Sequence, residues 1–206
     1  MGDPVDSVMM ERCLALAMEA ADNGEYPYAA VVARAGQIVC ESIGSVKHDR
    51  DVMHHAEVMA LSKAFGVLKR ASLEECTIYS NAEPCALCCY AMRESRIGRV
   101  VFGVPAPLTG GVSRWNILGD TELSEKLPEV FAPPPKIVAG FMREQIEAAL
   151  ARRNPLIWDF IRHRNIFGGP LPPHVLTSTT SHRKTKAYDM VMSFLRRHLF
   201  DYFGRS

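Results

Sequence analysis

The sequence lacks any long hydrophobic run, and no segment of about eighteen apolar residues occurs in its 206 positions. Because a membrane-spanning helix needs about twenty such residues, we expect none here. The amino terminus, Met1-Gly2-Asp3-Pro4, is acidic and lacks the basic segment and apolar stretch of a secretory signal. We therefore expect a cytoplasmic protein, in which the six cysteines are thiols or metal ligands rather than a disulfide framework.

The chain also lacks a strong excess of either charge. Its net charge is +1, because 13 Lys and Arg against 18 Asp and Glu in residues 1–142 give −5, and 11 against 5 in residues 143–206 give +6. A basic tail of this size is typical of a solvated surface, whereas a dedicated nucleic-acid binder carries a larger excess near its working site. Nucleic acid is therefore a poor candidate for a partner. An apolar content of 48% beside 23% charged residues excludes a wholly disordered or fibrous chain.

Hydrophobic periodicity predicts strands that alternate with helices. We expect a turn at Ala35-Gly36 between the first two strands and loops over 104–120, 128–135 and 168–186. Alternation of this kind predicts a single α/β sheet with helices on its faces. The predicted helices cover 10–21 (with Met10, Leu14, Ala17 and Ala21 on the buried face), 54–65 (ended by Gly66), 84–93 (with Pro84 first) and 142–153, and the predicted strands cover 28–33, 37–40, 76–80, 98–104 and 136–140.

The organisation of the chain suggests a domain over residues 1–155 and a carboxyl-terminal extension over residues 156–206. The extension contains an aromatic segment around Trp158, a proline-rich loop that begins at Gly168, and an amphipathic helix with apolar residues from Val191 to Tyr202. Such an apolar stripe most often docks on its own core or on a second subunit, and a membrane-surface helix is the alternative.

Two short patterns carry chemistry: His55-Ala56-Glu57, and Pro84-Cys85-Ala86-Leu87-Cys88. His-x-Glu arises by chance in roughly half of all chains of this composition, whereas Pro-Cys-x-x-Cys arises in about one in a hundred. Each pattern stands at the start of a predicted helix. Their joint occurrence is therefore a specific signal.

The spacing of these residues suits a catalytic metal site. Cys85 and Cys88 lie three positions apart in the first turn of a helix, so both sulfurs project from one face. The positive end of the helix favours thiolates, which are the form that binds metal. His55 supplies a third ligand, and three protein ligands leave the fourth position of Zn²⁺ open for water. Glu57 can reach that water, take its proton and pass it to a leaving amine.

These motifs resemble the zinc-dependent cytidine-deaminase superfamily, in its tRNA-adenosine and guanine deaminase branch. The resemblance covers roughly residues 8–155 and includes Gly24-Glu25-Tyr26-Pro27 before the first strand. It implies a three-layer α/β/α sandwich with a five-stranded mixed sheet, in which the two metal-bearing helices pack side by side. It also implies that His55, Cys85 and Cys88 bind zinc, that Glu57 shuttles protons, and that backbone N–H groups near Cys85 steady the substrate.

The sequence departs from the resembling family at the substrate pocket. Many members have an asparagine about ten residues before the zinc histidine, where this chain has Gly44-Ser45, and the family's Phe-Gly-Ala or Val-Gly-Ala turn appears as Tyr28-Ala29-Ala30. Both changes reshape the pocket. The resembling guanine deaminases carry a second acidic residue in the loop after the fourth strand. Candidate substrate contacts in this chain lie in that loop, in the two changed motifs and beside the cysteines. They are Ala30, Ser45, Glu83, Trp115, Asp120 and Glu122.

Three functions compete. The favoured one is hydrolytic deamination of a free nucleobase or a related amino-heterocycle such as guanine, cytosine or an s-triazine. The second is adenosine deamination in tRNA, which would use the basic carboxyl-terminal part. The third is a catalytically silent zinc-binding partner protein, and the intact Glu57 argues against it. The resemblance and the apolar stripe together predict a homodimer.

Overall fold

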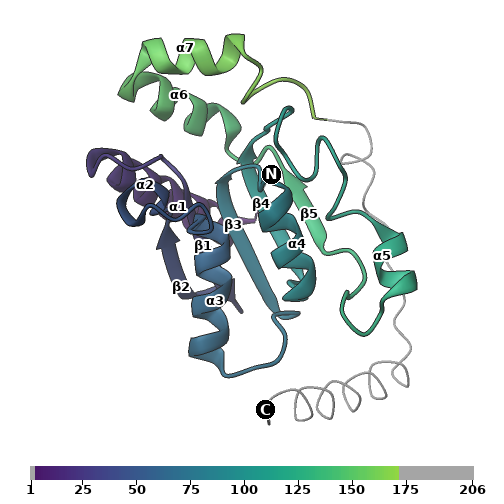
Figure 1. Cartoon of the computed structure of the whole chain (residues 1–206). Helices are drawn as coiled ribbons and strands as arrows, with labels where there is room; N and C mark the ends of the chain where they lie inside the picture. Colours follow the sequence, from purple (N-terminus) through teal and green to yellow (C-terminus); the bar gives the residue numbers. More distant parts are fainter. Residues whose placement is uncertain (1–2, 172–206) are drawn as a thin grey trace.

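The computed structural model describes residues 3–171, and a five-stranded mixed sheet lies at its centre (Figure 1). The strand order is β2-β1-β3-β4-β5. β1 is antiparallel to β2 and β3, whereas β3, β4 and β5 are parallel, so the carboxyl ends of these three strands meet at one end of the sheet. This confirms the predicted mixed sheet, whose strands are β1 (Ala29–Arg34), β2 (Gln37–Ile43), β3 (Cys76–Ala82), β4 (Arg99–Val104) and β5 (Lys136–Ala139).

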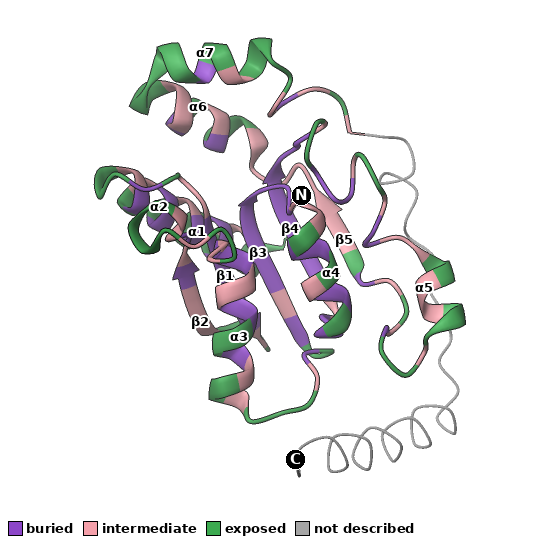
Figure 2. Cartoon of the chain, in the orientation of Figure 1, coloured by how far each residue is buried: buried purple, intermediate pink, exposed green. Residues whose placement is uncertain are grey.

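Helices cover both faces of the sheet and give the predicted three layers (Figure 1). Side chains along β1 point alternately toward the two helix layers. Ala30 and Val32 pack with α3 and α4, whereas Val31 faces α1, because successive strand side chains point to opposite faces. The three central strands, β1, β3 and β4, are largely buried, whereas the edge strands β2 and β5 are mostly half-buried or exposed (Figure 2). The covering helices are α3 (Ala56–Leu68) and α4 (Ala86–Glu94) on one face, and α1 (Pro4–Asp22) and α6 (Arg143–Arg153) on the other.

A further helix, α7 (Pro155–His163), spans the predicted boundary between residues 155 and 156. Asn154 caps this helix, because its side chain accepts a hydrogen bond from Ile157 N at 3.1 Å. Trp158 is buried in the same core cluster as residues of α1 and α6. α7 therefore packs through Trp158 on the same core as these two helices.

The structure corrects several details of the predicted elements. α3 runs through Gly66, because one glycine costs a helix only about 1 kcal/mol, and it ends instead at Leu68, where Lys69 caps it with a φ of 51°. α4 begins at Ala86 rather than Pro84, because Cys85 forms a β-bridge with Gly110 and stays extended.

The remaining differences are smaller. The buried face of α1 is rotated from the predicted stripe, so that Leu14 is half-buried while Cys13 and Leu16 are buried. Two helices, α2 (Val46–Asp49) and α5 (Thr121–Lys126), are too short to show a period in the sequence. The predicted amphipathic helix from Val191 to Tyr202 lies outside the described residues. Within residues 3–171, no helix is long and apolar enough to cross a membrane.

Candidate functional site

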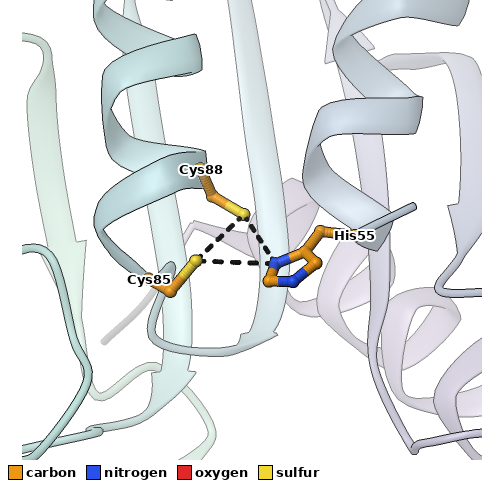
Figure 3. Close-up of side chains that lie close together, drawn as sticks. All are labelled: His55, Cys85 and Cys88. Carbon is orange, nitrogen blue, oxygen red and sulfur yellow. Dashed lines mark hydrogen bonds between the residues drawn. The ribbon is translucent and has the colours of Figure 1, made fainter. Parts of the chain in front are cut away.

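The three predicted metal ligands converge where β3 ends (Figure 3). His55 directly precedes α3, Cys85 directly precedes α4, and Cys88 lies in the first turn of α4. His55 Nδ1 lies 3.5 Å from Cys85 Sγ and 3.4 Å from Cys88 Sγ, and the two sulfurs are 3.6 Å apart. In the part of the chain that the structure describes, no other group of three such side chains could hold a metal ion.

These separations fit zinc. A tetrahedral ion with Zn–S bonds of about 2.3 Å and Zn–N bonds of about 2.05 Å would hold sulfur and nitrogen about 3.6 Å apart, and the two sulfurs about 3.8 Å apart. The observed distances differ from these edges by about 0.2 Å or less. The triad therefore forms three corners of a zinc tetrahedron without rearrangement, and it leaves a fourth corner for a further ligand.

The two cysteine sulfurs and the His55 ring interact directly. The sulfurs of Cys85 and Cys88 lie within hydrogen-bonding distance of each other, and this contact, together with the His55 ring, lowers the pKa of Cys85 to about 4. A lowered pKa favours the thiolate, which is the form of cysteine that binds metal. A divalent cation held by the triad would favour deprotonation of both thiols.

Glu57 is placed to carry protons beside the triad. It lies in the first turn of α3 and is 7% exposed, and this burial raises the pKa of its carboxyl group. Its Oε1 accepts a hydrogen bond from Ser80 Oγ at 3.0 Å, and its Oε2 lies 3.5 Å from Cys88 Sγ. A fixed carboxyl group with one oxygen toward the metal ligands suits a residue that accepts and returns a proton, and its raised pKa favours the protonated form that donates.

Ser80 is a partner of Glu57 that the sequence patterns missed. It sits in β3 opposite Ala30 of β1, and its hydroxyl donates to Glu57 Oε1. β3 also contains Thr77, Tyr79 and Asn81, so a polar residue in this strand gives no signal that Ser80 meets Glu57.

An aromatic pair lies at the same end of the sheet. The ring centroids of Tyr28 and Phe167 are 6.0 Å apart. Burial, together with the nearby Glu57 and Cys85, raises the pKa of Tyr28 to about 12, so its hydroxyl stays neutral. Gly168 N donates to Pro105 O at 2.8 Å. The chain after α7 therefore crosses the end of the sheet that carries the metal ligands, from the start of β1 to the end of β4.

Glu83, a predicted substrate contact, has partners within the protein, and its contact with the substrate stays a prediction. Its carboxylate is buried and accepts hydrogen bonds from backbone N–H groups of Ala106, Val112 and Ser113 and from the Ser113 hydroxyl. These bonds tie the loop after β4 to the turn that carries the cysteines.

The other predicted substrate contacts also have local partners, and their roles stay predictions. Ala30 is buried in β1, and Ser45 Oγ donates to Asp49 at 2.5 Å. Trp115 is 52% exposed, with the Arg114 guanidinium 5.5 Å from its ring centroid. Asp120 caps α5 by accepting from the N–H of Glu122, and the Glu122 side chain pairs with Lys126.

Comparison with known proteins connects this geometry to a family. Residues 4–104 match the family model described as the cytidine and deoxycytidylate deaminase zinc-binding region. The matched range contains all three metal ligands and Glu57. The zinc that this family binds is thus the metal that the triad fits.

Similar proteins include enzymes named for different substrates. The chain is 35% identical over 118 residues to a tRNA-specific adenosine deaminase of Aquifex aeolicus, covering 57% of this chain and 78% of that protein. It is 30% identical over 128 residues to a protein of Schizosaccharomyces pombe named "Probable cytosine deaminase", covering 61% and 72%. A solved structure from a study of A-to-I editing by tRNA:A34 deaminases is 25% identical with a TM-score of 0.61, covering 68% of this chain and 96% of that one. These similarities give no support to the prediction that nucleic acid is a poor candidate for a partner.

Proposed function

Because the chain belongs to the zinc-binding cytidine and deoxycytidylate deaminase family, we propose that it hydrolyses the exocyclic amino group of a free nucleobase or a related amino-heterocycle. Guanine, cytosine and s-triazines are the candidate substrates. The products are ammonia and the corresponding carbonyl compound. Water is the co-substrate.

The residues of the site have separate roles in metal binding, proton transfer and orientation. His55, Cys85 and Cys88 hold zinc, which when bound supplies Lewis-acid chemistry that makes water easier to deprotonate. Glu57 takes a proton from the attacking water at Oε2, the oxygen that faces Cys88, and returns it to the leaving amine. Ser80 holds the other carboxylate oxygen and so keeps Oε2 turned toward the metal side.

The observation that carries the choice of a small substrate is the path of the chain after α7. Phe167 packs against Tyr28, and Gly168 is hydrogen-bonded to Pro105. This segment crosses the end of the sheet where the metal ligands lie and places two aromatic rings there. Aromatic side chains favour a flat ring of the size of one base, which they can contact face to face or at an edge.

A second candidate is deamination of adenosine in tRNA, and the identity to tRNA-specific adenosine deaminases favours it. In this case the base would be flipped out of the nucleic acid into the same pocket. The chemistry at Glu57 would be unchanged, and only the delivery of the base would differ.

The experiment that separates the two is an ammonia-release assay on the purified full chain. The panel contains guanine, cytosine, ammeline-like triazines, their nucleosides, and an anticodon stem-loop with adenosine at the wobble position. We expect a free base or triazine to give the highest kcat/KM. Efficient turnover of the stem-loop with none of any free ring would overturn the choice and establish the second candidate. The Glu57→Gln variant serves as the blank, because contaminating deaminases would act in both preparations.

A further inference from the structure

Glu83 is a buried carboxylate two positions before the metal ligand Cys85, and it is 5% exposed. Its Oε2 accepts from Ala106 N at 2.7 Å and from Ser113 Oγ at 2.6 Å. Its Oε1 accepts from Val112 N at 3.1 Å and from Ser113 N at 2.5 Å. Four donors from one loop therefore surround one carboxylate, which offsets the cost of burying its charge.

The same loop is also bonded to the backbone beside Glu83. Gly111 N donates to Pro84 O at 2.8 Å, and Cys85 and Gly110 form an isolated antiparallel β-bridge. The loop thus runs along Glu83, Pro84 and Cys85 as a short extra strand would. This pairing explains why Cys85 keeps an extended conformation, with ψ of 174°, instead of joining α4.

Two glycines allow this close approach. A Cβ on Gly110 would lie 2.1 Å from Glu83 Oε1, and a Cβ on Gly111 would lie 2.5 Å from Cys89 Sγ. No side chain larger than hydrogen fits either position without a shift of the neighbouring atoms. Gly110 and Glu83 are therefore complementary parts of one contact, and Gly111 packs against Cys89.

We propose that Glu83 is a positioning residue: by fastening the loop 105–113, it holds the backbone of Cys85 so that its sulfur stays at zinc-binding distance from His55 and Cys88. Glu83 is not one of the three side chains that converge as metal ligands, so it would act on the metal through Cys85. The sulfur of Cys85 lies 3.5 Å from His55 Nδ1 and 3.6 Å from Cys88 Sγ, and rotation of the Cys85 backbone would change both distances. The proposal rests on the metal site and not on the identity of the substrate.

The test measures zinc release from the zinc-loaded full chain to a chromogenic chelator. In Glu83→Ala all four hydrogen bonds to the loop are lost, and we expect zinc release about 10–100-fold faster, the range for outer partners of metal ligands. Glu83→Gln keeps one acceptor oxygen, and its amide faces the N–H of Ala106. We therefore expect an intermediate rate. Glu94→Gln, the same change at an exposed position of α4, is the matched control and should release zinc as the wild type does.

Hydrogen exchange at the amides of Ala106, Val112 and Ser113 is the second measurement. We expect faster exchange in both Glu83 variants, in step with faster zinc release. If the amides exchange faster but zinc is released at the wild-type rate, Glu83 holds the loop without positioning Cys85. That result would overturn the proposal. If Glu83→Ala does not fold by circular dichroism, Glu83→Gln decides the question by the same criterion. Because neither measurement uses a substrate, a failed ammonia assay leaves this result unaffected.

Discussion

Loss of Glu57 should separate catalysis from metal binding, because its carboxylate carries the proton while the triad holds the zinc. In Glu57→Gln, the amide keeps the volume but cannot accept a proton from water. We expect zinc to stay at about one ion per chain and kcat to fall by about 10²–10⁴-fold. Elemental analysis and ammonia release on the identified substrate measure the two quantities. Turnover near that of the wild type would show that another group carries the proton.

The adjacent cysteines Cys88 and Cys89 offer a sharp test of the ligand set. Cys88 Sγ faces His55, whereas Cys89 Sγ donates to Pro84 O at 3.4 Å. Cys88→Ala should lose the bound zinc, because two protein ligands remain where three are needed. Cys89→Ala should keep it. Zinc content after gel filtration measures both, and equal zinc loss in the two variants would contradict the assignment.

Among the elements, α1 is tied to the sheet by a partly buried ion pair that should make stability depend on pH. Arg99 of β4 donates to both oxygens of Asp6 at 2.6 and 2.5 Å, and Tyr79 donates to Oδ1 at 2.8 Å. The Arg99 guanidinium holds the pKa of Asp6 below its ordinary value. An aspartate in an unfolded chain titrates near pH 3.9, so the pair contributes fully above about pH 4 and its contribution is lost as the pH falls through the lower folded pKa.

Asp6→Asn should therefore lower the free energy of unfolding at pH 7 by about 3 kcal/mol, because Arg99 loses its partner. The difference from the wild type should shrink as the pH falls below about 4. Urea unfolding at a series of pH values measures this. Glu75→Gln, which removes an exposed partner of Arg34, is the control and should cost less than about 1 kcal/mol. A constant difference across the pH series would contradict the role of Asp6 ionisation.

Local sequence patterns predicted the elements and the ligands, but not the contacts between distant segments. The metal site was predictable because His55, Glu57 and the two cysteines fall within two short motifs. The role of Glu83 was not, because its partners begin 23 positions later in a loop with no period. Arg93 makes a second set of contacts between distant segments that the sequence did not predict. Its buried guanidinium donates to the carbonyl groups of Ile117, Leu118, Asp120 and Ala132. Such pairings depend on how the whole sheet brings loops together, and no spacing in the sequence encodes them.

At the scale of the whole molecule, an exposed apolar face of α7 supports the predicted homodimer. Leu156, Ile157 and Phe160 are 83%, 55% and 57% exposed, and such an apolar face is costly in water. We expect light scattering to report twice the chain mass of 22.9 kDa at micromolar concentration. Phe160→Glu should shift the population toward the monomer. A wild-type monomer at these concentrations would contradict the prediction.

The response of activity to salt distinguishes a free ring from a polynucleotide through the charge of the molecule. Residues 1–142 carry a net charge of −5, and they include every ligand of the metal. A polynucleotide held by Lys and Arg releases counterions on binding, so its affinity falls by about 10³–10⁵-fold between 50 and 200 mM salt when several phosphates are contacted. A neutral ring carries no phosphates, so its binding releases no condensed counterions. We therefore expect kcat/KM on the best free-base substrate to change by less than about threefold over this range, since screening acts little on a neutral ligand.

Ammonia release at five salt concentrations measures the slope, with the anticodon stem-loop assayed in parallel. A steep fall for the best substrate would place phosphate contacts at the site and favour the tRNA reaction.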